Sequence, residues 1–222
     1  MQARKLIIGT YDTVLNGPWT LAECILGPAE YRTQFVEVPG RDGELDLSTA
    51  LTDGEPRYSS RQFSARLERS DGTRLDREAA INTMINWLDG WRMNIKLPDD
   101  PEHYITGRVH VAKEYNDMAH ASVLVTATVD PWRYNVNETV ISLTAAAEAA
   151  PARLTNNGRR TVVPVLEISG ESAEVLLVFG ANSWALGPGT YQLPDLVVPQ
   201  GGVEITYSGS GTLSFTYREA VI

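Results

Sequence analysis

Alternation of apolar and polar residues with a period of two is the feature that most limits how this chain can fold. In the segment 62–68, QFSARLE, the side chains of Phe63, Ala65 and Leu67 share one parity and the polar ones share the other. Because successive side chains of a strand point to opposite faces, this pattern predicts a strand with one wet face. The segment 44–51, ELDLSTAL, alternates in the same way, with Leu45, Leu47 and Leu51 on the apolar side. The chain is therefore expected to be mainly β.

Two features organise the strands of the N-terminal half. Between Tyr31 and Glu68, three alternating runs are separated by PGRDG and TDGEPR, which are rich in turn-forming residues and predict an antiparallel meander. The segments 104–112 and 121–129 predict two long arms, joined by KEYNDMAH, in which Asn116 and Asp117 suit a turn.

One segment has the periodicity of a helix. Ile81, Met84, Ile85 and Leu88 lie at the i, i+3, i+4, i+7 spacing, which predicts an apolar stripe that covers one face of the first sheet. Asp76 is expected to cap this helix, and Gly90 to end it. Trp87 and Trp91 lie near the end of the stripe.

The sequence pattern changes after the segment DPWRY, where long strand-like runs give way to small residues. The small-residue tract TAAAEAAPA has no apolar periodicity, and beyond it short strand-like runs follow one another at close intervals. This spacing predicts a compact β-sandwich, so we expect two domains, 1–135 and 136–222. The expected strands of the second domain are 161–169, 174–180, 189–198, 201–208 and 212–219, with SGSGT as a hairpin turn.

Composition excludes several classes of protein. The chain has 222 residues and a formal net charge of -9, which disfavours a protein that holds nucleic acid by its phosphates. The longest pure apolar run, VLLVF at 175–179, is far shorter than the roughly 20 residues of a membrane span. With Cys24 as its one cysteine, the chain has no internal disulfide, and this thiol is expected to be buried and inert.

No group of residues indicates catalysis, so we expect no enzyme, no cofactor and no metal site. His103, His110 and His120 lie on or beside predicted strands and lack the i, i+4 spacing of a metal-binding helix. The loop LPDDPEHY gathers Asp99, Asp100 and Glu102, which suits either an acid pair of a hydrolase or a solvated loop, and we favour the loop. Phosphate-binding glycine loops and a G-x-S-x-G elbow are absent from the sequence.

Several aromatic residues fall late in the chain. They form either a platform for sugar rings or part of a core, and the parity that Phe215 and Tyr217 share with Leu213 favours the core. The set is Trp184, Tyr191, Tyr207, Phe215 and Tyr217.

The order of these features resembles the distal tail proteins of long, non-contractile-tailed bacteriophages. The resemblance rests on the succession of VPGRDGELDLS, RQFSARLE, WLDGW, LPDDPEHYITGRVHV, VTATVDPWRY, LTNNGRRTVVPVLEISG and SGSGTLSFTYREAVI, and it spans nearly the whole chain. It implies a tail-tube-like N-terminal β-sandwich or barrel with one helix and a long hairpin, followed by a galectin-like C-terminal β-sandwich.

The resemblance also implies a function and a set of partners. The protein would be a virion subunit of a hexameric ring at the tail tip, assembled in the bacterial cytoplasm. The ring would join the major tail tube protein to the tail-tip protein and leave a channel through which DNA passes. Whether a receptor-binding protein is also a partner is left open by the resemblance. The alternative function is a carbohydrate-binding module.

We expect the contact between neighbouring copies to include the stretch VPGRDGE. An isolated two-stranded arm is marginal in water, so an identical neighbour would supply its missing partner. Pro39 and Gly40 can turn the backbone, and Arg41 and Asp42 can pair with a neighbour or with each other. An ordinary exposed hairpin tip is the alternative. The candidate interface residues are Val38, Pro39, Gly40, Arg41, Asp42, Gly43 and Glu44.

Overall fold

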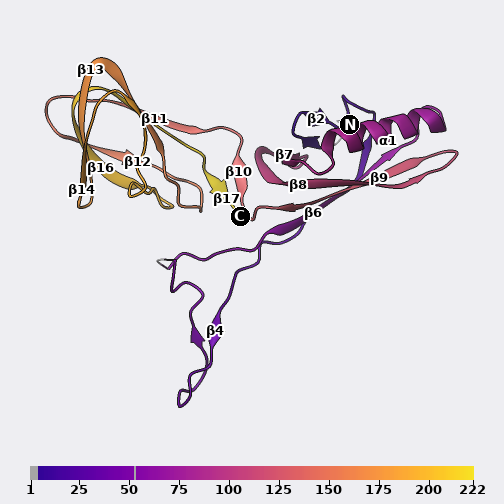
Figure 1. Cartoon of the computed structure of the whole chain (residues 1–222), viewed down its shortest axis with the longest axis horizontal. Helices are drawn as coiled ribbons and strands as arrows, with labels where there is room; N and C mark the ends of the chain where they lie inside the picture. Colours follow the sequence, from indigo (N-terminus) through magenta and orange to yellow (C-terminus); the bar gives the residue numbers. More distant parts are fainter. Residues whose placement is uncertain (1–4, 53) are drawn as a thin grey trace. The chain divides into compact units, whose positions relative to one another are not determined.

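The structure, a computed structural model, describes residues 5–52 and 54–222. It divides into two compact units, of which the first ends at Arg133 and the second begins at Tyr134 (Figure 1). Both units are built mainly of strands, so the predicted β-rich fold class is confirmed. The assignment of the units as a ring-forming domain and a galectin-like domain stays a prediction.

The first unit contains a curled sheet whose strands follow the order β2-β1-β7-β8-β9-β6-β3. The predicted strand 121–129 is β9 in full, and 104–112 lies inside the longer β8. The bounds are β1 Ile7–Ile8, β2 Tyr11–Asp12, β3 Thr20–Leu26, β6 Arg61–Arg69, β7 Arg92–Leu97, β8 Asp100–Asn116 and β9 Ala121–Val129.

One face of this sheet is apolar and carries the helix α1, Arg74–Leu88. Phe63, Ala65 and Leu67 are buried on that face, as their parity predicts. From the helix, Ile81, Met84 and Leu88 are fully buried against it, and Ile85 is half-buried at the margin of the same core. Trp87 and Trp91 are both partly exposed, and the Trp87 ring lies edge-on to the core residue Tyr11, with centroids 5.4 Å apart.

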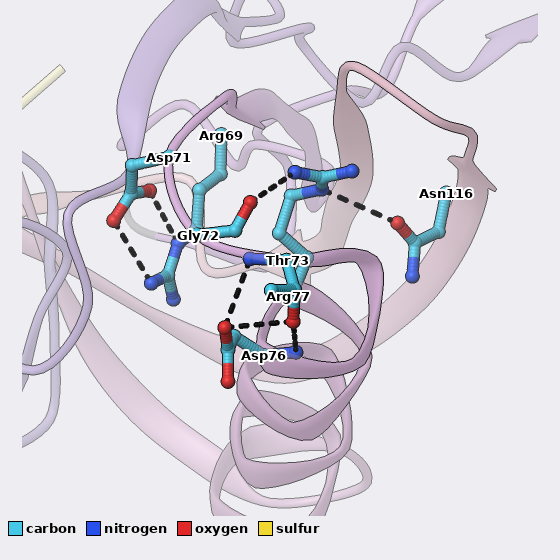
Figure 2. Close-up of polar contacts among 7 residues, drawn as sticks. All are labelled: Arg69, Asp71, Gly72, Thr73, Asp76, Arg77 and Asn116. Carbon is cyan, nitrogen blue, oxygen red and sulfur yellow. Dashed lines mark hydrogen bonds and ion pairs between the residues drawn. The ribbon is translucent and has the colours of Figure 1, made fainter.

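The start of α1 corrects one prediction. Thr73, not Asp76, is the N-cap: its hydroxyl accepts a hydrogen bond from the backbone N–H of Asp76, 3.2 Å away. Asp76 closes the capping box, since its carboxylate accepts from the Thr73 N–H at 2.8 Å (Figure 2). These bonds from Thr73 hold the pKa of Asp76 below its ordinary value.

Arg77, on the first turn of α1, is the largest fully buried side chain, with 2% of its surface exposed. Its guanidinium donates to the carbonyl oxygens of Gly72 (2.8 Å), Asp117 (2.9 Å) and Met118 (3.1 Å). It also donates to Asn116 Oδ1 at 3.4 Å (Figure 2). A single side chain thus ties the helix start to the turn between β8 and β9.

We predict that Arg77→Met lowers the stability of the first unit by about 1–3 kcal/mol, because it removes the hydrogen bonds that a buried guanidinium donates to three carbonyl oxygens. Arg74→Met, at an exposed position one residue into the same helix, is the matched control. Chemical denaturation of both variants measures the difference. Equal stability of the two variants would contradict the role given to Arg77.

The second unit is made of two four-stranded groups that share the long strands β13, Val165–Phe179, and β16, Val203–Tyr217. One end of the β13–β16 pair carries β11 and β15, and the other carries β12 and β14. The remaining bounds are β10 Arg133–Asn135, β11 Thr139–Thr144, β12 Ala150–Leu154, β14 Asn182–Leu186, β15 Gly189–Gln192 and β17 Ala220–Val221.

The stretch SGSGT, predicted to be a hairpin turn, lies inside β16, so this prediction is wrong. The predicted strands 201–208 and 212–219 merge into one, as do 161–169 and 174–180. The pairing of β13 with β16 shifts register between Ser169 and Glu174, and Gly209 lies beside this bulge with φ +119°. Glycine therefore bends the strand without ending it.

The core of the second unit holds the late aromatic residues. Phe215 and Tyr217 are buried in it, and Trp184, Tyr191 and Tyr207 are partly buried and pack against it. The core interpretation of these residues is confirmed.

Gly209→Ala is expected to destabilise the second unit, because an added Cβ would lie 1.9 Å from the Glu174 carbonyl oxygen. Gly180→Ala is the matched control, since Gly180 also has a positive φ, +57°, but open space around it. The clash should cost about 1–3 kcal/mol, in addition to a backbone strain that is greater at φ +119° than at φ +57°. Thermal unfolding of the two variants with equal midpoints would refute the bulge geometry.

Candidate assembly surface

Residues 27–60, which we call the arm, leave the first sheet between β3 and β6 and extend away from it (Figure 1). The arm is a narrow hairpin in which β4, Phe35–Val36, pairs with β5, Leu45–Asp46. Two more hydrogen bonds hold the residue before β4. The Gln34 carbonyl oxygen accepts from Leu47 N–H, and the Gln34 N–H donates to the side-chain Oγ of Ser48, both at 2.8 Å. The predicted three-stranded meander is wrong: β5 pairs with β4, in a sheet of two strands that are two residues long each, and β6 pairs with β3 and β9 instead.

The base of the arm is fixed to the sheet. Tyr31 bridges to Tyr58, with ring centroids 4.9 Å apart, and Tyr58 packs edge-on against Trp132 at 5.3 Å. Arg61 Nε donates to the Gly27 carbonyl oxygen at 2.7 Å. The arm therefore begins from a defined position.

Beyond this base, apolar side chains of the arm are exposed. Phe35 has 53% of its surface exposed and Leu51 has 97%, and Tyr31, Val36 and Val38 are exposed as well. Leu51 was predicted to lie inward with Leu45 and Leu47, but it falls in a turn, so this prediction is wrong. Asp53, part of the predicted turn TDGEPR, lies outside the described residues.

All seven candidate interface residues, 38–44, are exposed and form the turn that joins β4 to β5. Arg41 N–H donates to the Val38 carbonyl oxygen at 3.1 Å. A Cβ built on Gly40 or Gly43, which have φ +83° and +78°, would meet nothing within 4 Å. The turn thus stands clear of the rest of the chain, which leaves it accessible to another molecule.

The charge of the arm tip is acidic. The segment 37–46 holds four carboxylates and one guanidinium, that of Arg41. Within the part of the chain that the structure describes, no ion pair joins Arg41 to Asp42. The hydroxyl and the N–H of Ser48 lower the pKa of Asp46, which keeps this carboxylate charged.

The exposed apolar residues of the arm were missed by sequence reasoning. Alternation distinguishes the two faces of a strand, but it does not say whether a second layer covers the apolar one. The signal that could have found them is the density of turn residues around runs too short to build a sheet.

The residues considered for chemistry are held by neighbours of ordinary kinds. Asp100 accepts from His103 Nδ1 (2.7 Å) and Arg133 (2.9 Å), and His110 Nδ1 lies 2.7 Å from Asp89 Oδ1. The stretch LPDDPEHY is not a loop as predicted, because the chain turns at Pro98–Asp99 and β8 begins at Asp100. Cys24 is half-buried in β3.

Two searches over the described residues bear on other kinds of site. No group of three or more His, Cys, Asp or Glu residues within 5–52 and 54–222 is placed to hold a metal ion. Over the same residues, no helix has the length and apolar character that a membrane span requires.

Comparison with known proteins gives a likeness among solved structures. No protein-family model matches the chain, and no curated protein matches it. Among solved structures, the chain is similar to the crystal structure of SPP1 Dit (gp 19.1), described as a paradigm of the hub adsorption apparatus in phages that infect Gram-positive bacteria. The two are 14% identical, with a TM-score of 0.66, over 96% of this chain and 98% of that one. The expected Dit-like fold is confirmed.

Limited proteolysis tests the accessibility of the arm. In dilute, monomeric protein, trypsin should cut after Arg41 well before it cuts after Arg66 or Arg108, which lie in paired strands. Mass spectrometry of the early fragments identifies the first cut. First cuts at Arg66 or Arg108 would show that the arm is not exposed as described.

Proposed function

We propose that this protein is a structural subunit of a hexameric ring at the distal end of a phage tail. The ring joins the tail tube to the tail-tip proteins and leaves a channel for DNA. The observation that carries this proposal is the exposed arm, on a fold that matches a phage hub protein over nearly its full length.

The arm supports assembly for a physical reason. A ladder of two residues cannot sustain a hairpin in water, and the exposed Phe35, Val36 and Leu51 gain free energy only when another surface covers them. In a ring with rotational symmetry each contact joins two different faces, so an arm on one copy can lie on a different surface of the next. Identical copies are therefore the simplest source of that cover.

The partners follow from the position proposed for the ring. One side would meet the major tail tube protein and the other the tail-tip protein, with a receptor-binding protein as a further partner. DNA would only pass through, which suits a chain with a net charge of -9 because a ring multiplies the repulsion of phosphates. Such a protein acts in the virion, after assembly in the bacterial cytoplasm, and catalyses no reaction.

The alternative of a carbohydrate-binding module with an aromatic platform loses its basis. The late aromatic residues proposed as its platform belong to, or pack against, the core of the second unit. A stacking surface for neutral sugars would need those rings on the outside.

Replacing Arg41 and Asp42 together with alanine should weaken ring formation or joining to the tail while the subunit stays folded. Both residues are exposed in the turn that joins β4 to β5, so the change should leave the fold of the first unit intact. Negative-stain microscopy and light scattering measure assembly, and circular dichroism measures folding.

The matched control is Arg153→Ala with Glu204→Ala, an exposed pair of opposite charge at paired positions of β12 and β16. It removes the same charges from the second unit. Unaltered assembly of the arm variant, or an equal loss in both variants, would count against an interface at the arm tip. Wild-type protein that stays monomeric beside its tail components would end the ring proposal itself.

A further inference from the structure

The helix α1 has an outward face that carries no charge over most of its length. Between Ala79 and Leu88 the sequence contains no Asp, Glu, Lys or Arg, although 21% of the residues of the chain are charged. The side chains of this segment that are exposed are those of Ala79, Asn82, Thr83, Asn86 and Trp87. The solvent face of a helix is usually lined with charged and polar side chains, whereas a lack of charge is typical of the centre of an interface. The composition of this face therefore indicates a surface that another molecule covers.

Four outward residues of α1 form a row, which we call the outer row. Leu75, Ala79, Thr83 and Trp87 follow one another at intervals of four, so they lie along one ridge of the helix surface. Leu75 has 81% of its surface exposed and Trp87 has 41%. The Thr83 hydroxyl donates to the Ala79 carbonyl oxygen at 2.9 Å, so the methyl group is what this residue offers to a partner. The outer row is therefore apolar in its contacts from end to end.

Both ends of the outer row are held in place. At the start of the helix, the buried guanidinium of Arg77 binds the carbonyl oxygen of Gly72 and two carbonyl oxygens of the turn between β8 and β9. At the other end, the Trp87 ring lies edge-on to buried Tyr11, with centroids 5.4 Å apart. A partner that binds the row therefore loses little free energy to ordering it.

The charge of the outer row suits the arm of a second copy. The arm tip, 37–46, holds four carboxylates and one guanidinium. The helix face from 79 to 88 holds no carboxylate that would repel this tip. Two carboxylates of the first turn are already engaged, since Asp76 accepts from Thr73 N–H at 2.8 Å and Glu78 pairs with Lys113 at 2.8 Å. Exposed Arg74 adds a positive charge at the start of the helix.

The apolar parts of the arm and of the outer row also agree in length. From Leu75 to Trp87 the helix rises by about 18 Å, at about 1.5 Å per residue. The arm carries its exposed apolar side chains from Tyr31 to Val38, a segment that spans at most roughly 23 Å when extended. One segment can therefore cover the other along most of its length.

Ring symmetry and the remaining exposed surface favour the same pairing. Contacts in a ring are heterologous, so the arm of one copy lies on a surface of the next copy other than its arm. Among the described residues of the first unit, the exposed large apolar side chains outside the arm and α1 lie on turns, at strand ends or on the edge strand β3. They are Val14, Leu15, Ile25, Trp91, Tyr115 and Met118. The outer row differs from them because a continuous uncharged surface joins Leu75 to Trp87.

We infer that the arm of one copy lies along the outer row of α1 on the next copy. The apolar side chains of the arm, such as Phe35 and Val36, then lose their exposure against Ala79, Thr83 and Trp87 of the neighbour. This inference rests on the proposed ring, and it names the surface that covers the arm.

Cysteine cross-linking of the assembled full-length protein tests this contact. In a Cys24→Ser background, Val38→Cys is combined with either Ala79→Cys or Thr83→Cys, all at exposed positions. A short bismaleimide should join neighbouring copies into a ladder of covalent oligomers on a denaturing gel. The control pair is Val38→Cys with Thr128→Cys, an exposed position between two core residues of β9 and so on the sheet face opposite α1. It should give no ladder.

The outcomes separate this inference from the ring itself. Rings in negative-stain images without cross-links from either helix position would overturn the inference and leave the proposed function standing. Equally strong cross-linking of the control pair would overturn it as well. Wild-type protein that forms no ring beside its tail components would remove both.

Charge substitutions at Thr83 provide a second measurement. Thr83→Glu should weaken ring formation about tenfold in light scattering over a concentration series, because it opposes the acidic arm tip, whereas Thr83→Lys should not weaken it. Glu and Lys both favour a helix, so circular dichroism should show both variants folded. Thr190→Glu, at an exposed position of β15, is the control for added negative charge and should leave assembly unchanged. Equal effects of the two Thr83 variants, or equal losses in Thr83→Glu and Thr190→Glu, would contradict the inference.

Discussion

Everything in the first unit follows from the need to cover apolar strand faces, and the arm is where the chain alone does not meet that need. The sheet buries one face under α1 and the core closes completely around Ile81, Met84 and Leu88. The arm has no such layer: Phe35 and Leu51 face solvent, and the ladder of β4 and β5 offers two residue pairs. In the proposed ring, a neighbouring copy would supply the missing cover.

The contacts at the base of the arm reduce the free energy that ordering the arm would cost on binding. A loosely tethered hairpin would lose much of its binding free energy to ordering. Here the Tyr31 ring packs on Tyr58 and the Tyr58 ring lies edge-on to Trp132, so the base of the arm is held before any partner arrives. Arg77 does the same for the turn between β8 and β9, because it binds the carbonyl oxygens of Asp117 and Met118 from inside.

Sequence patterns predict the strands and the helix whose form depends on residues that are close in the chain. The alternation over 121–129 defines β9 to the residue, and the stripe of α1 is correct in its buried members. It does not predict that Gly209 bends β16 instead of ending it, since a positive φ serves a bulge as well as a turn. It does not predict buried Arg77 either, because three of its four acceptors, on Asn116, Asp117 and Met118, lie about forty residues away in sequence. The candidate interface residues 38–44 were correctly predicted to include a turn. The exposure of the apolar residues beside them was not predicted, because alternation does not say whether a second layer covers the apolar face.

Most of this fold is set by patterns of apolar and polar residues and not by particular side chains, which explains how 14% identity can accompany a TM-score of 0.66. A fold set by parity, strand length and a few bends tolerates the exchange of nearly every side chain, provided the apolar face stays apolar. A contact made by strand edges and apolar cover tolerates such exchange equally well.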